Sequence, residues 1–263
     1  MTPAQSALLD RLTNALGQDP RIQALWLAGS LAQGGGDAWS DIDLVAQVDA
    51  ADMAGCLNDY KGPRPGLPER VHVLEVYGCI INSVTTTWER FDIVFLPEVQ
   101  IRKTYGSELK PLSGAAVQLD PKPDTDADAA TAERVEALIL EFLRVLGLGP
   151  VAVGRGEWIV AQQGHSLLRD MTVNLMLEGA GVPRAARGAK RLNVFLQPAQ
   201  QAALEAIMPP AANRESLLQS QAAIGRLFLG EARPIAARMG ITWPKAFEAA
   251  TREHLRTELG LEL

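Results

Sequence analysis

The stretch between Gly29 and Leu44, GSLAQGGGDAWSDIDL, constrains the fold of this chain more than any other. It joins two apolar runs, IQALWLAG and DIDLVAQV, which predict two buried β-strands. Asp41 and Asp43 stand two residues apart on the second predicted strand, and since strand side chains alternate, both carboxylates point to the same face. Two like charges held this close repel each other, and a divalent cation such as Mg²⁺ removes the repulsion. The stretch therefore predicts a sheet that carries metal-dependent chemistry on a phosphate.

A third carboxylate, Asp92, lies on a later predicted strand, RFDIVFLP. Phe91, Ile93 and Phe95 alternate with it and are expected to face the core. A third acid near the first two can bind a second metal ion, take the proton from an attacking hydroxyl, or do both. We predict the three aspartates as metal ligands and catalytic residues.

The residues that flank the first strand and the Asp pair predict a phosphate-binding loop. Gly29 and Ser30 stand between the first strand and a short predicted helix, where backbone N–H groups and a hydroxyl bind terminal phosphates well. Glycine lets a phosphate come close to the backbone. Gly34–Gly36 form a flexible turn back to the second strand. We add Ser40, which directly precedes Asp41, to the predicted nucleotide-binding group with Gly29 and Ser30.

The remainder of the chain divides in two. Thr2 and Gln5 predict a capped helix at the start, and VHVLEVY and CIINSVTT predict two more strands, with a possible hairpin turn at Tyr77-Gly78. We predict an α/β (α+β) domain with a mixed sheet over residues 1–120, a Pro- and Asp-rich linker over 121–128, and an all-helical bundle over 129–263. The bundle is expected to open with TAERVEALILEFLRVLG and GEWIVAQQGHSLLRDMTVNLMLEGAG, followed by three or four helices interrupted at Pro198, Pro209-Pro210, Gly230 and Gly240.

Composition sets outer limits on the function. The net charge of −6 argues against a nucleic-acid partner, which would favour a basic face, and is compatible with a cationic small substrate. The two cysteines form no disulfide framework or zinc motif, so a reducing, cytoplasmic location is expected. We see no signal peptide and no apolar run long enough to predict a membrane span.

The order of these features resembles the signature of the nucleotidyltransferase superfamily (polymerase β-like). In that signature a Gly-Ser, here Gly29-Ser30, is followed about ten residues later by the D-x-D pair, and a third acid stands on a later strand. The P-loop pattern GxxxxGK[ST] is absent from the sequence, so a Walker-type site is not the source of phosphate binding.

The second half resembles the antibiotic-modifying members, which act on aminoglycosides and lincosamides and join such a domain to a helical bundle. The similar stretch runs from Arg169 through TVNLMLEGAG to KRLNVFLQP. The resemblance implies that Arg169 and Lys190, with Arg191 as a helper, hold the triphosphate. It also implies that Mg²⁺, expected as two ions, and a nucleoside triphosphate, expected to be ATP, serve the transfer of a nucleoside monophosphate to a small-molecule hydroxyl, releasing pyrophosphate. Asp92 would act as metal ligand and base.

Several alternatives stay open from the sequence. The acceptor could be a protein side chain or another metabolite, and the chain could be a nucleotide-binding module without turnover. Nothing decides between a monomer and a homodimer. Four further residues are candidates for the acceptor pocket: Glu89, Glu157, Trp158 and His165. Three of them have a structural alternative, with Glu89 as a solvated turn acid, Trp158 as a core residue and His165 as a hydrogen-bonded surface residue.

Overall fold

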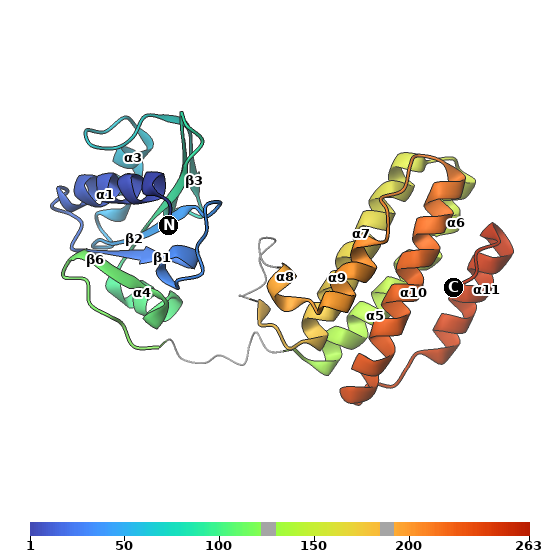
Figure 1. The fold of residues 1–263 in the computed structure, drawn as a ribbon. Coiled ribbons are helices and arrows are strands. Elements are labelled where there is room, and N and C mark those ends of the chain that lie inside the picture. The colour runs from blue at the N-terminus through green and yellow to red at the C-terminus, as the bar shows by residue number, and fades with distance from the viewer. Residues whose placement is uncertain (122–129, 185–191) are drawn as a thin grey trace. The chain divides into compact units, whose positions relative to one another are not determined.

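The computed structural model describes residues 1–121, 130–184 and 192–263. The chain forms two compact units, Met1–Asp124 and Thr125–Leu263, each with its own core (Figure 1). The predicted linker, residues 121–128, lies outside the described residues except for residue 121.

The first unit is built on a mixed six-stranded sheet with the strand order β3-β4-β5-β2-β1-β6. Only the central pair, β2 and β5, is parallel; the other neighbours are antiparallel. The strands are β1 (Ala24–Ala28), β2 (Ile42–Gln47), β3 (Arg70–Val76), β4 (Ile80–Thr85), β5 (Arg90–Leu96) and β6 (Lys110–Gly114). The predicted mixed sheet is confirmed.

Helices cover the sheet on both faces, as Figure 1 shows for α1 and α4. Leucines of α1 (Pro3–Gly17) and the buried residues of α3 (Met53–Lys61) pack on one face. On the other face α4 (Glu98–Thr104) packs through Ile101 against Trp26, Val45 and Val94. The unit also contains α2 (Gly29–Ala32) and a 3₁₀ helix, Gly106–Glu108. The sheet therefore has two apolar layers, and a polar residue on either face is conspicuous.

Local signals in the sequence account for most of this unit. Thr2 and Gln5 cap α1 reciprocally, as predicted: Thr2 N donates to Gln5 Oε1 at 2.7 Å and Gln5 N to Thr2 Oγ1 at 3.1 Å. The β3–β4 hairpin turns at Tyr77-Gly78, both with positive φ, the backbone that tight hairpins require. One boundary differs from the prediction, because β2 begins at Ile42 and leaves Asp41 just outside the strand.

The second unit is helical, as predicted, and its core is one apolar cluster shared by its helices. At its centre Phe142 of α5 and Phe228 of α10 stack with ring centroids 3.5 Å apart. Gly230, a predicted break, lies inside α10 instead. The helices are α5 (Ala132–Gly147), α6 (Gly149–Gly154), α7 (Trp158–Gly179), α8 (Leu192–Phe195), α9 (Pro198–Glu205), α10 (Arg214–Arg238) and α11 (Lys245–Leu259).

The segment Ala132–Gly154 is long and apolar enough to cross a membrane by length and composition. It spans α5 and α6, with the boundary between the two helices at Leu148. Val135, Ile139 and Phe142 of α5 are buried in the helical core, and 28% of the apolar stretch is buried within the structure.

Candidate active site

Two of the predicted acids lie side by side at the centre of the sheet. β2 and β5 are parallel neighbours, and Asp43 pairs directly with Asp92 in their register. Asp43 alternates with Ile42 and Leu44, which are buried under α1 and α3, so its side chain belongs to the opposite face. The strand pairing thus brings together two acids that are 49 residues apart in the sequence, and Asp41, which directly precedes β2, is two residues from Asp43.

Gly29 forms a cradle for the Asp43 carboxylate. Its φ of +63° lies in the left-handed region that favours glycine. A Cβ on this residue would overlap Oδ2 of Asp43, so only glycine leaves room for the carboxylate there. Gly29 begins α2 immediately after β1, as the sequence predicted for a short helix at this point.

The loop between α2 and β2 is organised by a hydroxyl network. Ser30 Oγ donates to Ser40 Oγ at 3.0 Å, and Ser40 Oγ donates to Asp37 Oδ1 at 3.1 Å. Hydrogen bonds from the Trp39 N–H and the Ser40 hydroxyl hold the pKa of the Asp37 carboxyl below its usual value. Two of the predicted nucleotide-binding residues, Ser30 and Ser40, are therefore in direct contact.

Helix α1 also holds the loop between α2 and β2 in place, through Gln5. Gln5 is 8% exposed, and its Nε2 donates to the carbonyl oxygens of Asp37 at 2.8 Å and of Ser40 at 2.9 Å. The residue that caps α1 therefore also fixes the backbone that leads into Asp41.

A cation of the protein stands beside Asp41. Nη1 of Arg90 lies 4.0 Å from Asp41 Oδ2, and Nη2 donates to the Trp39 carbonyl at 2.7 Å. This guanidinium offsets part of the repulsion between the neighbouring acids.

Sequence reasoning missed two residues near the acids. Asn82 of β4 pairs directly with Asp92, so an amide stands beside the carboxylate in the neighbouring strand. Burial, and after it the charge of Asp43, raise the pKa of the Tyr105 hydroxyl, which places Tyr105 close to that acid. The alternation of Asn82 with the buried Ile81 and Ser83 was a usable signal, whereas nothing in the sequence marked Tyr105.

Glu89 belongs to the turn between β4 and β5. Its carboxylate accepts hydrogen bonds from Thr87 Oγ1 at 2.9 Å and from Thr85 Oγ1 at 3.4 Å, and its N–H donates to Thr85 Oγ1 at 3.0 Å. These bonds tie the side chain to its own turn, in agreement with the structural alternative given for it.

In the helical unit, Arg169 lines a cleft of about 530 Å³ between α7, α8 and α9. Its Nη1 donates to the Leu204 carbonyl at 2.9 Å, and Asp170 and Glu205 line the same cleft. Lys190 and Arg191 lie outside the described residues.

The other three candidates also lie in the helical unit. Glu157 is exposed and precedes the first residue of α7, and Trp158 packs partly buried against the helical core. His165 is 5% exposed, and its Nδ1 has no hydrogen-bond partner among the described residues. The alternative of a hydrogen-bonded surface histidine is therefore wrong: His165 is three residues before the buried Leu168 on the apolar side of α7.

The three aspartates are the candidate metal ligands of the first unit. Within residues 1–121, 130–184 and 192–263, no three His, Cys, Asp or Glu side chains are grouped so that they could hold a metal ion as they stand. The chemistry of the donors still fits a hard cation, since Asp41, Asp43 and Asp92 offer oxygen ligands only. Gly29 adds to this fit by leaving room for the Asp43 carboxylate, whose Oδ2 a Cβ at this position would overlap.

Comparisons with known proteins give structural similarity only. No protein-family model and no curated protein matches the sequence. An aminoglycoside 6-adenyltransferase from Bacillus subtilis is 12% identical, with 97% of this chain and 98% of that chain covered and a TM-score of 0.44. A nucleotidyltransferase-like protein from Exiguobacterium sibiricum is 11% identical, with 98% and 88% covered and a TM-score of 0.35.

A third similar structure is the CD-NTase CdnG from Bradyrhizobium diazoefficiens in complex with GTP. It is 14% identical, with 98% of this chain and 89% of that chain covered and a TM-score of 0.31. The TM-scores of all three are below 0.5, so the function has to be argued from the residues of the site.

Proposed function

We propose that this protein is a nucleotidyltransferase that transfers a nucleoside monophosphate to a hydroxyl group. The observation that carries the proposal is the juxtaposition of Asp43 with Asp92 on parallel strands, with Gly29 shaped to admit the Asp43 carboxylate. A merely structural sheet has no need for two acids in one register pair on a face where the next residues along both strands, Val45 and Val94, pack in an apolar layer.

In this reaction the substrate hydroxyl oxygen attacks the α-phosphorus of a nucleoside triphosphate. The bond from the α-phosphorus to the bridging oxygen breaks, and pyrophosphate leaves with that electron pair. Asp92 accepts the proton of the attacking hydroxyl and passes it to solvent. Gly29 and Ser30, with Ser40 behind Ser30, bind phosphate oxygens through N–H and O–H groups.

Asp41, Asp43 and Asp92 would hold Mg²⁺, with two ions expected. When bound, Mg²⁺ would supply positive charge for the triphosphate and the departing pyrophosphate. Arg90, whose Nη1 lies 4.0 Å from Asp41 Oδ2, supplies part of this positive charge from the protein itself.

We further propose ATP as the nucleotide and an aminoglycoside or lincosamide as the acceptor, in the cytoplasm. The nucleotide and the acceptor follow from the sequence resemblance, and the net charge of −6 suits a cationic acceptor. The location follows from the two cysteines, which form no disulfide framework. The same resemblance supports Arg169, Lys190 and Arg191 as contacts of the triphosphate. Arg169 donates through Nη1 to Leu204, and a guanidinium has further N–H donors for a ligand.

The test is pyrophosphate release with Mg²⁺, each of four nucleoside triphosphates and a panel of aminoglycosides and lincosamides. Asp43→Asn and Asp92→Asn keep the shape of each side chain and should abolish release. Asp49→Asn, an exposed aspartate just after β2, is the matched control and should leave release unchanged. Nucleotide binding without pyrophosphate release would favour a nucleotide-binding module. Pyrophosphate release only with a protein or metabolite acceptor would replace the antibiotic by that class of acceptor.

A further inference from the structure

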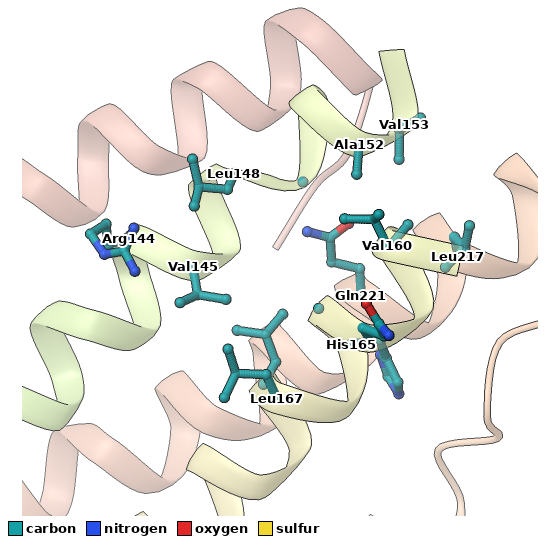
Figure 2. A pocket seen from close by; sticks show the side chains of 15 residues that line it. Arg144, Val145, Leu148, Ala152, Val153, Val160, His165, Leu167, Leu217 and Gln221 are labelled. Carbon is teal, nitrogen blue, oxygen red and sulfur yellow. The ribbon is translucent and has the colours of Figure 1, made fainter. Parts of the chain in front are cut away.

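The helical unit contains a cavity of about 330 Å³ between α5, α6, α7 and α10. Figure 2 shows Val145, Val160 and Leu167 around it, with Gln221 among them. Its size lies within the range of small-molecule sites, and a mainly apolar lining with a few polar groups is the usual character of such sites.

Gly164 keeps one wall of this cavity open. It lies inside the 22-residue helix α7 and lines the cavity, and a Cβ built on it would meet nothing within 4 Å. A glycine inside a helix destabilises it by about 1 kcal/mol relative to alanine. The chain therefore accepts a weaker helix at the position where a side chain would extend into the cavity.

The next residue, His165, adds a second cost at the same wall. His165 is only 5% exposed, and its Nδ1 has no hydrogen-bond partner among the described residues. A buried polar atom without a hydrogen bond costs about 1–3 kcal/mol. A bundle selected for packing alone would avoid both a helix-weakening glycine and an unpaired imidazole beside one void.

The charges around the cavity indicate what it can bind. Among the described residues that line the cavity, Arg144 is the one Lys, Arg, Asp or Glu residue. Its guanidinium already donates hydrogen bonds to the Glu141 carboxylate at 2.7 and 2.6 Å. Leu148, Val160 and Leu167 line the cavity and remain 48–49% exposed. The site thus offers an apolar approach and no unbalanced charge for an ionic ligand.

We propose that this cavity binds a small, uncharged and mainly apolar molecule. The proposal goes beyond nucleotidyl transfer and does not depend on it, because its residues lie in the helical unit and its test needs no turnover.

The experiment is a calorimetric titration of the full chain with toluene and benzyl alcohol, and with benzylamine and benzoate as charged counterparts of similar size. We expect saturable one-to-one binding of both uncharged probes and at least tenfold weaker binding of the charged ones. Gly164→Leu fills the cavity and should weaken binding of the uncharged probes at least tenfold. Gly230→Leu is the matched control, since Gly230 is also a helix-interior glycine with nothing within 4 Å of a Cβ but is exposed on α10; it should bind like wild type.

Three results would overturn the proposal. The first is a wild-type chain that binds neither uncharged probe. The second is wild-type affinity in folded Gly164→Leu; if that variant does not fold, Ala161→Leu on the same wall provides the same test. The third is concentration-dependent self-association that Leu148→Ser abolishes while no probe binds, which would assign the apolar face to a second copy of the chain.

Discussion

A side chain at position 29 would occupy the space that holds the Asp43 carboxylate. Gly29→Ala is therefore the sharpest single test of the cradle. The added methyl group must displace the carboxylate, and misplacement of a reacting group by about 1 Å can cost about 100-fold in rate. We expect kcat/KM for nucleotidyl transfer to fall by about 100-fold in this variant.

Gly34→Ala is the control for this variant, because Gly34 also has a positive φ, +75°, but nothing lies within 4 Å of its missing Cβ. Both variants should lose about 1 kcal/mol of stability to backbone strain in thermal unfolding. Only Gly29→Ala should lose activity, and equal activity in the two variants would argue against the cradle.

Asp19 is the buried acid whose ion pairs hold the first unit together away from the site. Its carboxylate, 1% exposed, lies 2.7 Å from Nη2 of both Arg21 and Arg64. The hydrogen bond from Arg21 is the main reason that the pKa of the Asp19 carboxyl lies below its usual value. Since both arginines are partly exposed, we expect Asp19→Asn to lower the free energy of unfolding by about 2 kcal/mol at pH 7.

The pH dependence of this effect has a definite sign. A lowered pKa in the folded state means that the contribution is complete above the unfolded value, near 3.8, and is lost as the pH falls through the folded value. In denaturant titrations the difference between wild type and Asp19→Asn should shrink below about pH 4. The exposed Asp10→Asn should show no such difference at any pH.

At the scale of elements, α1 orients the loop that leads into Asp41. Gln5→Glu keeps an oxygen that can accept from Thr2 but removes both donations to the Asp37 and Ser40 carbonyls. We expect the variant to lose about 1–2 kcal/mol in thermal unfolding and about tenfold in kcat/KM. Gln18→Glu, on an exposed residue just after α1, should leave kcat/KM unchanged, and a fully active Gln5→Glu would show that the loop does not need this anchor.

The elements also show how far the sequence alone could lead. Strands β1 to β5 were predictable because their apolar residues run continuously or alternate. Strand β6 was not, because Pro111 and Gly114 argue against a strand, and the sheet tolerates them at its edge. Gly230 was predicted as a break, but the burial of Phe228 and Leu229 beside it outweighs the roughly 1 kcal/mol that glycine costs a helix.

The site was predictable to a similar extent. The spacing in the sequence indicated Asp41, Asp43 and Asp92, but not the register that pairs Asp43 with Asp92. Asn82 and Tyr105 come to the acids through strand pairing and through the packing at the end of α4, which no local pattern records.

At the scale of the whole molecule, the chain combines a sheet unit that carries the acids with a helical unit that carries a separate apolar cavity. The sheet unit has acids aligned on one face of its sheet, and the helical unit has few polar groups around its cavity. Because these chemistries differ, we propose the acids of the first unit as the catalytic groups and the apolar cavity of the second unit as a separate ligand site.

Nucleotidyl transfer is distinguished from other reactions of ATP by following its α- and γ-phosphates separately. Reactions contain Mg²⁺, the panel of aminoglycosides and lincosamides, and ATP labelled with radioactive phosphorus at either the α- or the γ-phosphate. We predict that the α label appears on an acceptor, that the γ label appears in pyrophosphate, and that Asp43→Asn abolishes both. Transfer of the γ label to an acceptor, or its release as inorganic phosphate while the α label stays in ADP, would contradict nucleotidyl transfer.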